Sequence, residues 1–373
     1  MRVLFVDGEP GQLDELRRLV GAGQGLGGWE ARFALGADDA LAAMAEAPVD
    51  VLVADLDMPG MDGAELLAEA RERHPQTVRI LRSTRPDDAA AIRAVPVAHQ
   101  VVDKPTDPAA LAGAIERAAA LRDLLGREAL REVVGQVDTL PSPPGTWLAL
   151  TKVLDDPHAG VVDVAQIVRQ DPAMSAKLLQ VVNSSFASLS RRLSSVDEAV
   201  TYLGFETVRS LTLSVGVFRS FPAGGRIAPA VFDRLAAHGA LCAELAQTLV
   251  DDRADAQHAF AAGLLQDVGQ LVLAANLTES FAADLATAEE RDEPLHLVEQ
   301  EHGYTHAHVG AYLLGLWGLP PAVVDAVARH HDDPVPGART GVAEALQLAI
   351  SLVDPQAGGA EAEPSEDGRA WTI

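Results

Sequence analysis

Four side chains in the first 104 residues have the chemistry that a phosphoryl-accepting site needs. Asp55 ends a long apolar run and precedes a Pro-Gly turn, and three more residues end other expected strands: Asp7, Ser83 and Lys104. A carboxylate that accepts a phosphoryl group needs a hard cation held by oxygens, a hydroxyl for a phosphoryl oxygen, and an ammonium as a point charge. The alternative for any one position is an ordinary solvated loop residue. The four types together predict a phosphate-handling site.

Short apolar runs alternate with amphipathic stretches over residues 1–108, which predicts βαβ units and a parallel sheet. Because open parallel sheets bind ligands beyond the carboxyl ends of their strands, the four side chains are expected to meet there. Strands are expected at Val3–Val6, Glu30–Leu35, Val49–Leu56, Val78–Arg82 and Gln100–Val102. Helices are expected at Gln12–Val20, Asp38–Ala47, Ala64–Arg73 and Asp87–Ala94, and Asp62 with Glu65 predicts a capping box.

A second set of ionisable residues lies on apolar helical stripes in the C-terminal half: His238, Asp267, His306, His330, His331 and Asp354. Burying such groups costs several kcal/mol unless they meet one another or a metal. The stripes therefore favour a convergent cluster, although a single histidine on such a stripe is usually a hydrogen-bonded core residue. Imidazoles with carboxylates suit Zn, Fe or Mn, and a metal-bound water can hydrolyse a phosphoester.

The length of 373 residues favours two or three domains. A helix is expected to begin after Asp107 and to continue past Leu125, as a linker or as a pairing surface for a second copy. The Pro-rich segment 140–145 marks the next boundary, and the residues after it show helical periodicity. The boundaries expected are an α/β domain at 1–121, an overlapping helical linker at 109–136, an all-α domain at 137–354 and a disordered acidic tail at 355–373.

The charge balance excludes several classes of partner. The formal net charge of −25 repels phosphate backbones, so no direct nucleic-acid contact is expected, and the partner is expected to be a protein or a small molecule. A single cysteine, Cys242, excludes an internal disulfide and fits a reducing compartment. With no signal peptide and no apolar stretch that spans a membrane, a cytoplasmic location is expected.

Residues 1–121 resemble a response-regulator receiver domain, most closely in the turn Asp57–Gly63. The resemblance implies a flavodoxin-like doubly wound fold, Asp55 as the phosphoacceptor, Ser83 as the switch hydroxyl and Lys104 as the phosphate-sensing lysine. It also implies a Mg²⁺ ion, with ligands expected from Asp7, Glu9, Asp55 and Asp57. The family usually has two adjacent acids at the end of the first strand. Here the second is Gly8, so weaker Mg²⁺ binding is expected.

Residues from Leu140 to Asp354 resemble an HDOD domain, through the segments Gln170–Ser184, Glu198–Gly204 and His306–Gly310. This family is related to HD phosphohydrolases, but its members are generally regarded as signalling or scaffold modules without established catalysis. Where HD hydrolases have an adjacent His-Asp pair, this chain has Gln266 and Asp267. An amide is a poor ligand for a transition metal, so the cluster is expected to be the remnant of a metal centre.

Three hypotheses follow for the function. The first is a two-component response regulator, phosphorylated on Asp55 by a sensor histidine kinase, whose helical output domain binds a protein partner. The second is a metal-dependent phosphohydrolase acting on a nucleotide or a cyclic dinucleotide. The third makes the receiver an unphosphorylated docking module, which Gly8 favours.

Overall fold

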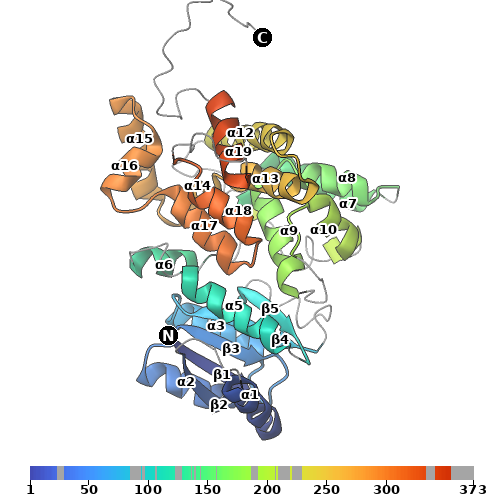
Figure 1. Ribbon diagram of the computed structural model, residues 1–373, viewed down its shortest axis with the longest axis vertical. Helices are drawn as coiled ribbons and strands as arrows, with labels where there is room; N and C mark the ends of the chain where they lie inside the picture. Colours follow the sequence, from blue (N-terminus) through green and yellow to red (C-terminus); the bar gives the residue numbers. More distant parts are fainter. Residues whose placement is uncertain are drawn as a thin grey trace, which may run out of the picture.

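The computed structural model describes the chain except for residues 23–28, 85–93, 95–96, 106, 122–127, 136, 138–139, 143, 157, 186–191, 206, 209–218, 221–228, 333–340 and 354–373. The N-terminal part is an α/β domain and the C-terminal part is a bundle of helices stacked on it (Figure 1). The expected fold class is confirmed. Asp354, the acidic tail, most of the helix expected at Asp87–Ala94 and the middle of the linker lie outside the described residues.

The α/β domain is built on a five-stranded parallel sheet in the order β2-β1-β3-β4-β5. Its strands are β1 (Arg2–Asp7), β2 (Glu30–Leu35), β3 (Val51–Asp55), β4 (Val78–Ser83) and β5 (Gln100–Asp103). Its helices are α1 (Pro10–Ala22), α2 (Gly36–Glu46), α3 (Gly63–Arg73) and α5 (Pro108–Leu121). All residues of β3 and β4 are buried, as expected for strands covered on both faces.

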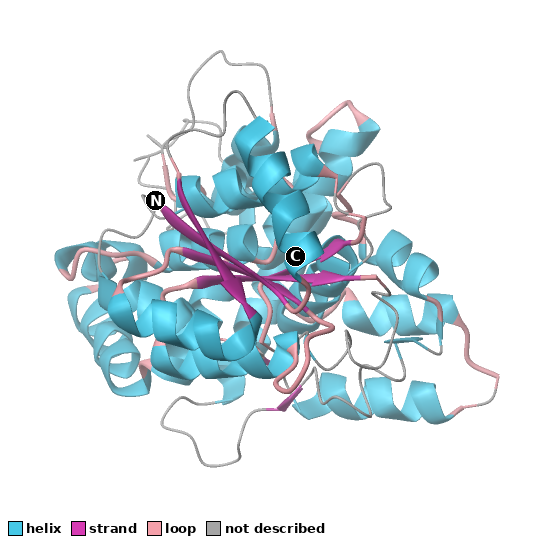
Figure 2. Cartoon of the chain, turned by 90° about the horizontal axis from the view of Figure 1, so that it is seen from below, coloured by secondary structure: helices cyan, strands magenta, loops and turns pink. Residues whose placement is uncertain are grey.

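Two apolar layers sandwich the sheet, which Figure 2 shows in magenta between cyan helices. Alternate strand residues such as Val53 and Ile80 pack against α1 and α5. Their neighbours, such as Leu52 and Leu81, pack against α2 and α3. This alternation fixes the register, and every strand therefore ends at the same edge of the sheet.

The helical half begins after α6 (Glu128–Gly135). Its helices are α7 (Pro144–Asp155), α8 (Val161–Val168), α9 (Pro172–Ser185), α10 (Val196–Leu203), α12 (Pro229–Thr248), α13 (Arg253–Leu265), α14 (Val268–Asn276), α15 (Thr278–Arg291), α16 (Leu295–Glu301), α17 (His306–Leu316), α18 (Pro321–Ala328) and α19 (Val342–Val353). A small departure from the all-α expectation is a parallel pair of two-residue strands, β6 (Pro141–Ser142) and β7 (Arg219–Ser220).

The two domains share one apolar core. The buried cluster on the α1/α5 face of the sheet continues through Leu121 and Leu130 to Leu313 and Trp317. A Cβ built on Gly315 would lie 2.3 Å from a methyl carbon of Leu121, so α5 and α17 pack at the limit of approach. The helical half is therefore seated directly on the last strand and last helix of the α/β domain.

Polar contacts reinforce this seat. The side-chain amide of Gln100 in β5 donates to the carbonyl oxygen of Leu316 at 3.1 Å. In the opposite direction, the amide of Gln180 in α9 donates to the carbonyl oxygen of Ala98 at 3.3 Å. Because these donors and acceptors are buried, a change in the position of β5 must be felt in α9 and α17.

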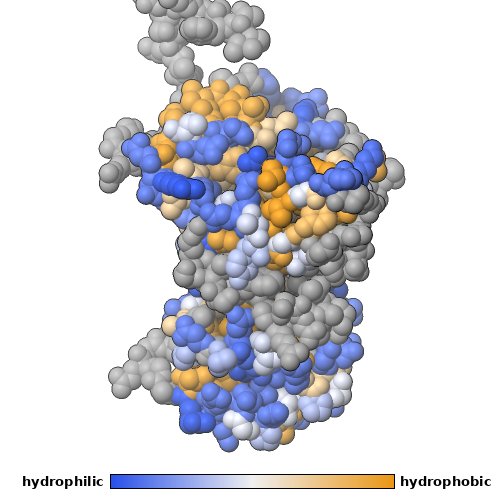
Figure 3. All heavy atoms as spheres, turned by 90° about the vertical axis from the view of Figure 1, so that its right-hand side faces the viewer, coloured by the Kyte–Doolittle hydropathy of each residue, from blue (hydrophilic) through white to orange (hydrophobic). Residues whose placement is uncertain are grey.

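Among the described residues, no helix combines the length and the apolar character needed to cross a bilayer. On the face shown in Figure 3, larger hydrophobic patches lie on the helical half, and hydrophilic residues predominate at the lower end of the α/β domain.

Candidate functional site

The carboxyl ends of β1 and β3 bring Asp7 and Asp55 together. Val6 pairs with Ala54 in the parallel ladder, so the two aspartates end neighbouring strands side by side. Asp7 is fully buried and Asp55 is 3% exposed. Ser83 ends β4, and Lys104 follows β5. The structure therefore brings the four residues singled out in the sequence to one edge of the sheet.

Lys104 joins the two carboxylates. Its Nζ lies 2.6 Å from Oδ1 of Asp55 and 3.3 Å from Oδ2 of Asp7. The other oxygen of Asp7, Oδ1, accepts the backbone N–H of Glu9 at 3.0 Å. Burial raises the pKa of Asp55, against the opposing effect of the Lys104 ammonium. Asp55 is thus a buried carboxyl group whose ionised form is stabilised by the adjacent Lys104 ammonium.

Arg82 is a second cation in this pocket, and the sequence reasoning missed it. Its Nη1 lies 3.3 Å from Oδ2 of Asp7, and its side chain is only 5% exposed. Arg82 pairs with Asp55 in the β3–β4 ladder, so its side chain must cross the end of β3 to reach β1. The signal in the sequence was an arginine in a buried strand, where a charged side chain needs a buried counter-charge.

The remaining sequence-predicted residues lie at the rim of the pocket. Glu9 and Asp57 are exposed, and Ser83 is buried beside Asp55. The turn after Asp55 is held by the capping box at the start of α3, where Asp62 accepts the Glu65 N–H at 2.8 Å and Glu65 accepts the Asp62 N–H at 3.0 Å. The expected box is therefore confirmed.

Glycine is required in the loops around the acidic edge. A Cβ on Gly63 would lie 2.1 Å from the carbonyl oxygen of Asp55, so only glycine lets α3 begin against the end of β3. A Cβ on Gly8 would lie 2.5 Å from Cδ of Pro59. The side chain of Pro59 therefore closes over the position where a second acid would stand.

The helical half contains the second cluster, and five of its six predicted members meet there. Nδ1 of His238 lies 3.2 Å from Oδ2 of Asp267, and the other oxygen of Asp267 lies 3.5 Å from Nε2 of His306. That nitrogen faces Nε2 of His331 at 2.9 Å, and the His330 ring lies beside both. The sixth member, Asp354, is outside the described residues.

Hydrogen bonds fix the protonation of two imidazoles. Nδ1 of His306 lies 2.7 Å from Oε2 of the buried Glu299, and Nδ1 of His330 donates to the carbonyl oxygen of Val327 at 2.7 Å. Burial lowers the pKa of His330 to about 4, so this ring is neutral and its Nε2 carries a lone pair. His330 Nε2 has no hydrogen-bond partner. Glu299 was not predicted from the sequence, since its helix showed an ordinary apolar stripe.

Gln266 occupies the position of the missing imidazole. It is fully buried, and its amide nitrogen lies 3.1 Å from Nδ1 of His238. The bond to Asp267, joined by a contact with Cys242, outweighs burial and raises the pKa of His238 to about 10. Burial opposes ionisation of Asp267, but the bond from His238 and the nearby imidazoles lower the Asp267 pKa to about 2. His238 and Asp267 therefore form a hydrogen-bonded ion pair.

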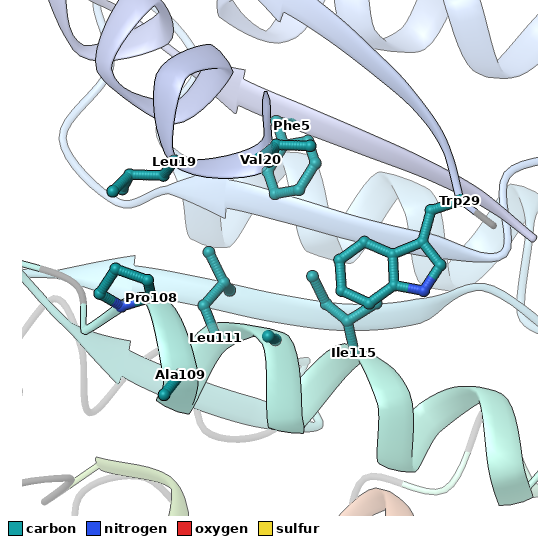
Figure 4. Close-up of a pocket in the computed structure, with 9 residues that line it drawn as sticks. Phe5, Leu19, Val20, Trp29, Pro108, Ala109, Leu111 and Ile115 are labelled. Carbon is teal, nitrogen blue, oxygen red and sulfur yellow. The ribbon is translucent and has the colours of Figure 1, made fainter. Parts of the chain in front are cut away.

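A separate cavity lies between α1 and α5 (Figure 4). Its volume is about 220 Å³, and the residues that line it are Phe5, Leu19, Val20, Trp29, Pro108, Ala109, Leu111, Ala112 and Ile115. No lining residue is titratable. The cavity offers no group for acid–base, nucleophilic or metal chemistry, so the two polar clusters remain the candidate sites.

Two family models match the chain. The response regulator receiver domain matches residues 3–116, and the HDOD domain matches residues 140–333. Among solved structures, the MmoQ response regulator from Methylococcus capsulatus is 26% identical with a TM-score of 0.48, and the match covers 58% of this chain and 86% of that one.

Curated relatives match parts of the chain. An uncharacterized protein of Treponema pallidum is 25% identical over 54% of this chain and 39% of its own length. The hydrogenase transcriptional regulatory protein HoxA of Cupriavidus necator is 35% identical over 33% of this chain and 25% of its own length. The matched region is thus less than half of each relative. The chain belongs to the HDOD family, and a response regulator receiver domain precedes its HDOD domain.

Proposed function

We propose that this response regulator receives a phosphoryl group on Asp55 from a sensor histidine kinase and transmits the change to an HDOD domain that binds a protein partner. The observation that carries the proposal is the buried Asp55 carboxylate, whose Oδ1 lies 2.6 Å from Lys104 Nζ at the end of β3. Receiver domains are phosphorylated by sensor kinases. We expect the protein to act in the cytoplasm and to bind Mg²⁺ weakly.

Each residue of the pocket has a role in this transfer. An oxygen of Asp55 bonds to the phosphorus of the donor while the bond from phosphorus to the leaving group breaks. The Lys104 ammonium moves with the charge from the carboxylate to the phosphoryl oxygens. The Ser83 hydroxyl, one residue beyond the ladder partner of Asp55, then donates to a phosphoryl oxygen.

The packing of β5 supplies the route to the output domain. Lys104 follows β5 directly, and the same strand carries Gln100, whose amide holds the carbonyl of Leu316. A shift of Lys104 toward a phosphoryl group therefore pulls on the strand that supports α9 and α17. We propose that phosphorylation changes how the HDOD domain packs against the receiver domain, and therefore which surface the HDOD domain exposes to its partner.

The phosphoacceptor is tested with acetyl phosphate as donor. The full chain is expected to gain one phosphoryl group, because the Asp55 oxygen displaces acetate, and Asp55→Asn is expected to gain none. Asp233→Asn is the control, since Asp233 is an exposed aspartate on α12 in the helical half. Intact mass measures the transfer. Equal labelling of Asp55→Asn and wild type contradicts the assignment, and no labelling of wild type favours the unphosphorylated docking module.

The switch has its own test. Beryllofluoride with Mg²⁺, a phosphoryl mimic, is expected to change hydrogen exchange across Ser83–Leu121 and in α17. Unchanged exchange in both segments contradicts the proposed route even when Asp55 is phosphorylated.

A metal-dependent phosphohydrolase is the second candidate, and one observation favours it. The described cluster contains buried imidazole nitrogens without partners, Nε2 of His330 and Nδ1 of His331, and His306, His330 and His331 offer ligand atoms within 4.8 Å of one another. Three histidines are a sufficient set of protein ligands for Zn²⁺. The ion pair of His238 and Asp267 and the amide of Gln266 oppose a two-metal centre.

Elemental analysis separates the two candidates. Our leading proposal expects less than one transition metal per chain in protein purified without chelator, and no turnover on a panel of nucleotides and cyclic dinucleotides. One metal per chain that is lost in His330→Asn, but retained in His158→Asn at an exposed position, reverses the order of the candidates.

A further inference from the structure

Receiver domains generally bind Mg²⁺ at their acidic pocket, and the donor set of this pocket does not fit that ion. Mg²⁺ demands near-octahedral oxygen ligands at about 2.0–2.1 Å. Oδ2 of Asp7 already faces Arg82 and Lys104, and Oδ1 accepts the Glu9 N–H. The second acid is absent, and Pro59 closes over Gly8. The buried carboxylate oxygens of Asp7 are thus committed to donors of this chain.

The charges of the pocket lead to the same result. Asp7 and Asp55 carry two buried negative charges, and Arg82 and Lys104 bring two positive ones. The four buried charges therefore cancel without a metal, and the other two acids of the pocket, Glu9 and Asp57, are exposed at its rim. A divalent ion beside Asp7 would add two positive charges to this balanced buried set. Compared with the receiver pattern of two adjacent acids, Gly8 removes one negative charge, and Arg82 adds one positive charge. Together these two changes make the pocket more positive by two charges, which equals the charge that one Mg²⁺ ion would bring.

The placement of Arg82 needs a long side chain. Neighbouring strands lie about 4.8 Å apart, and β3 stands between β4 and β1, so the side chain must span roughly 10 Å between backbones. The guanidinium reaches Asp7 while passing the end of the strand that carries Asp55. It is thereby held next to both carboxylates by the register of the sheet.

We propose that the Arg82 guanidinium is the resident cation of this pocket: it takes the place of the divalent ion, excludes it, and supplies fixed positive charge for an anion on Asp55. The inference rests on the proposed function only for that last role. A phosphoryl group carries roughly −1.5 to −2 charge, and a guanidinium presents a planar fork of N–H donors to its oxygens. Arg82 is thus a phosphate-positioning residue built into β4.

The test measures binding of Mn²⁺, used as the probe for a hard divalent cation, to the full chain without any phosphodonor. Wild type is expected to bind Mn²⁺ weakly, and Arg82→Gln at least about tenfold more tightly, because the repelling charge beside Asp7 is gone. Arg73→Gln is the control, since Arg73 pairs with Glu69 on the exposed face of α3 and should leave the affinity unchanged. Free Mn²⁺ is followed by its electron paramagnetic resonance signal.

Two further variants make the result decisive. Asp7→Asn combined with Arg82→Gln is expected to lose the gain, which places the new binding at this pocket. Arg82→Met fills a similar buried volume with an uncharged, apolar side chain. If Arg82→Gln does not fold, the Mn²⁺ affinity is measured on this variant instead. Equal affinity of wild type and both single Arg82 variants overturns the inference. The assay measures Mn²⁺ binding and no phosphoryl transfer. Its result therefore stands whether or not Asp55 is phosphorylated.

Discussion

Gly269→Ala is expected to destabilise the protein by more than about 3 kcal/mol, at or above the upper end of the usual cost of overpacking. A Cβ at this position would lie 1.9 Å from the carbonyl oxygen of His306 and 2.8 Å from the backbone nitrogen of Gly310. Both are backbone atoms, so no side chain can rotate away, and α14 must separate from α17. Urea denaturation followed by circular dichroism measures the free energy of unfolding.

Gly11→Ala is the matched control for this prediction. A Cβ on Gly11 meets nothing within 4 Å, and the residue lies in α1. Alanine in an open helical position should leave the protein as stable as wild type or raise its free energy of unfolding by roughly 0.5–1 kcal/mol. If the two variants unfold at the same urea concentration, a methyl group at position 269 does not force α14 away from α17, and the prediction is wrong.

Arg79→Met is expected to lower the free energy of unfolding by about 3–5 kcal/mol, because it strands buried polar groups. Arg79 is 1% exposed. Its Nε donates to Val97 O at 2.7 Å, its Nη1 to Thr77 O at 3.1 Å and its Nη2 to Gly135 O at 2.6 Å. Burial lowers the pKa of Arg79 to about 9, which shows how little water reaches this side chain. Methionine fills the volume but pairs none of the carbonyls.

The bond to Gly135 makes the variant a test of domain coupling as well. Gly135 ends α6, between the receiver and HDOD domains, so Arg79→Met is expected to speed hydrogen exchange in α6 more than in α2. Arg17→Met is the control, because Arg17 forms an exposed pair with Asp14 and should change stability by less than about 0.5 kcal/mol. Equal destabilisation by the two variants contradicts the role given to Arg79.

The sequence predicted the receiver sheet well, because its strands are apolar runs that end at turns. The strand expected at Glu30–Leu35 has those bounds in the structure, and the meeting of Asp7, Asp55 and Lys104 at one edge followed from the positions of the strand ends. Ser195 followed by Glu198 is also a capping-box pattern in the sequence, and the structure forms it in one direction. Ser195 accepts the Glu198 N–H, whereas the Glu198 side chain accepts from Gln257. A distant partner competed with the local one, which a local pattern cannot reveal.

The sequence did not predict those residues whose role depends on a contact with another helix or strand. Arg82 was counted as the end of a strand, and only the order of the sheet shows that it reaches Asp7. Glu299 lies on α16, and its bond to His306 depends on how α16 and α17 pack. Periodicity places residues on faces of their own helix or strand, but it does not say which faces meet.

The apolar core shared by the two domains has a consequence for how the protein melts. Since α5 and α17 approach to the limit at Gly315 and Leu121, neither domain can unfold without exposing the core of the other. The chain should behave as one cooperative unit on heating, with a single transition instead of separate receiver and HDOD transitions. A ligand that binds only at Asp55 would then protect the distant helices from heat, and each domain expressed alone would carry an open apolar face.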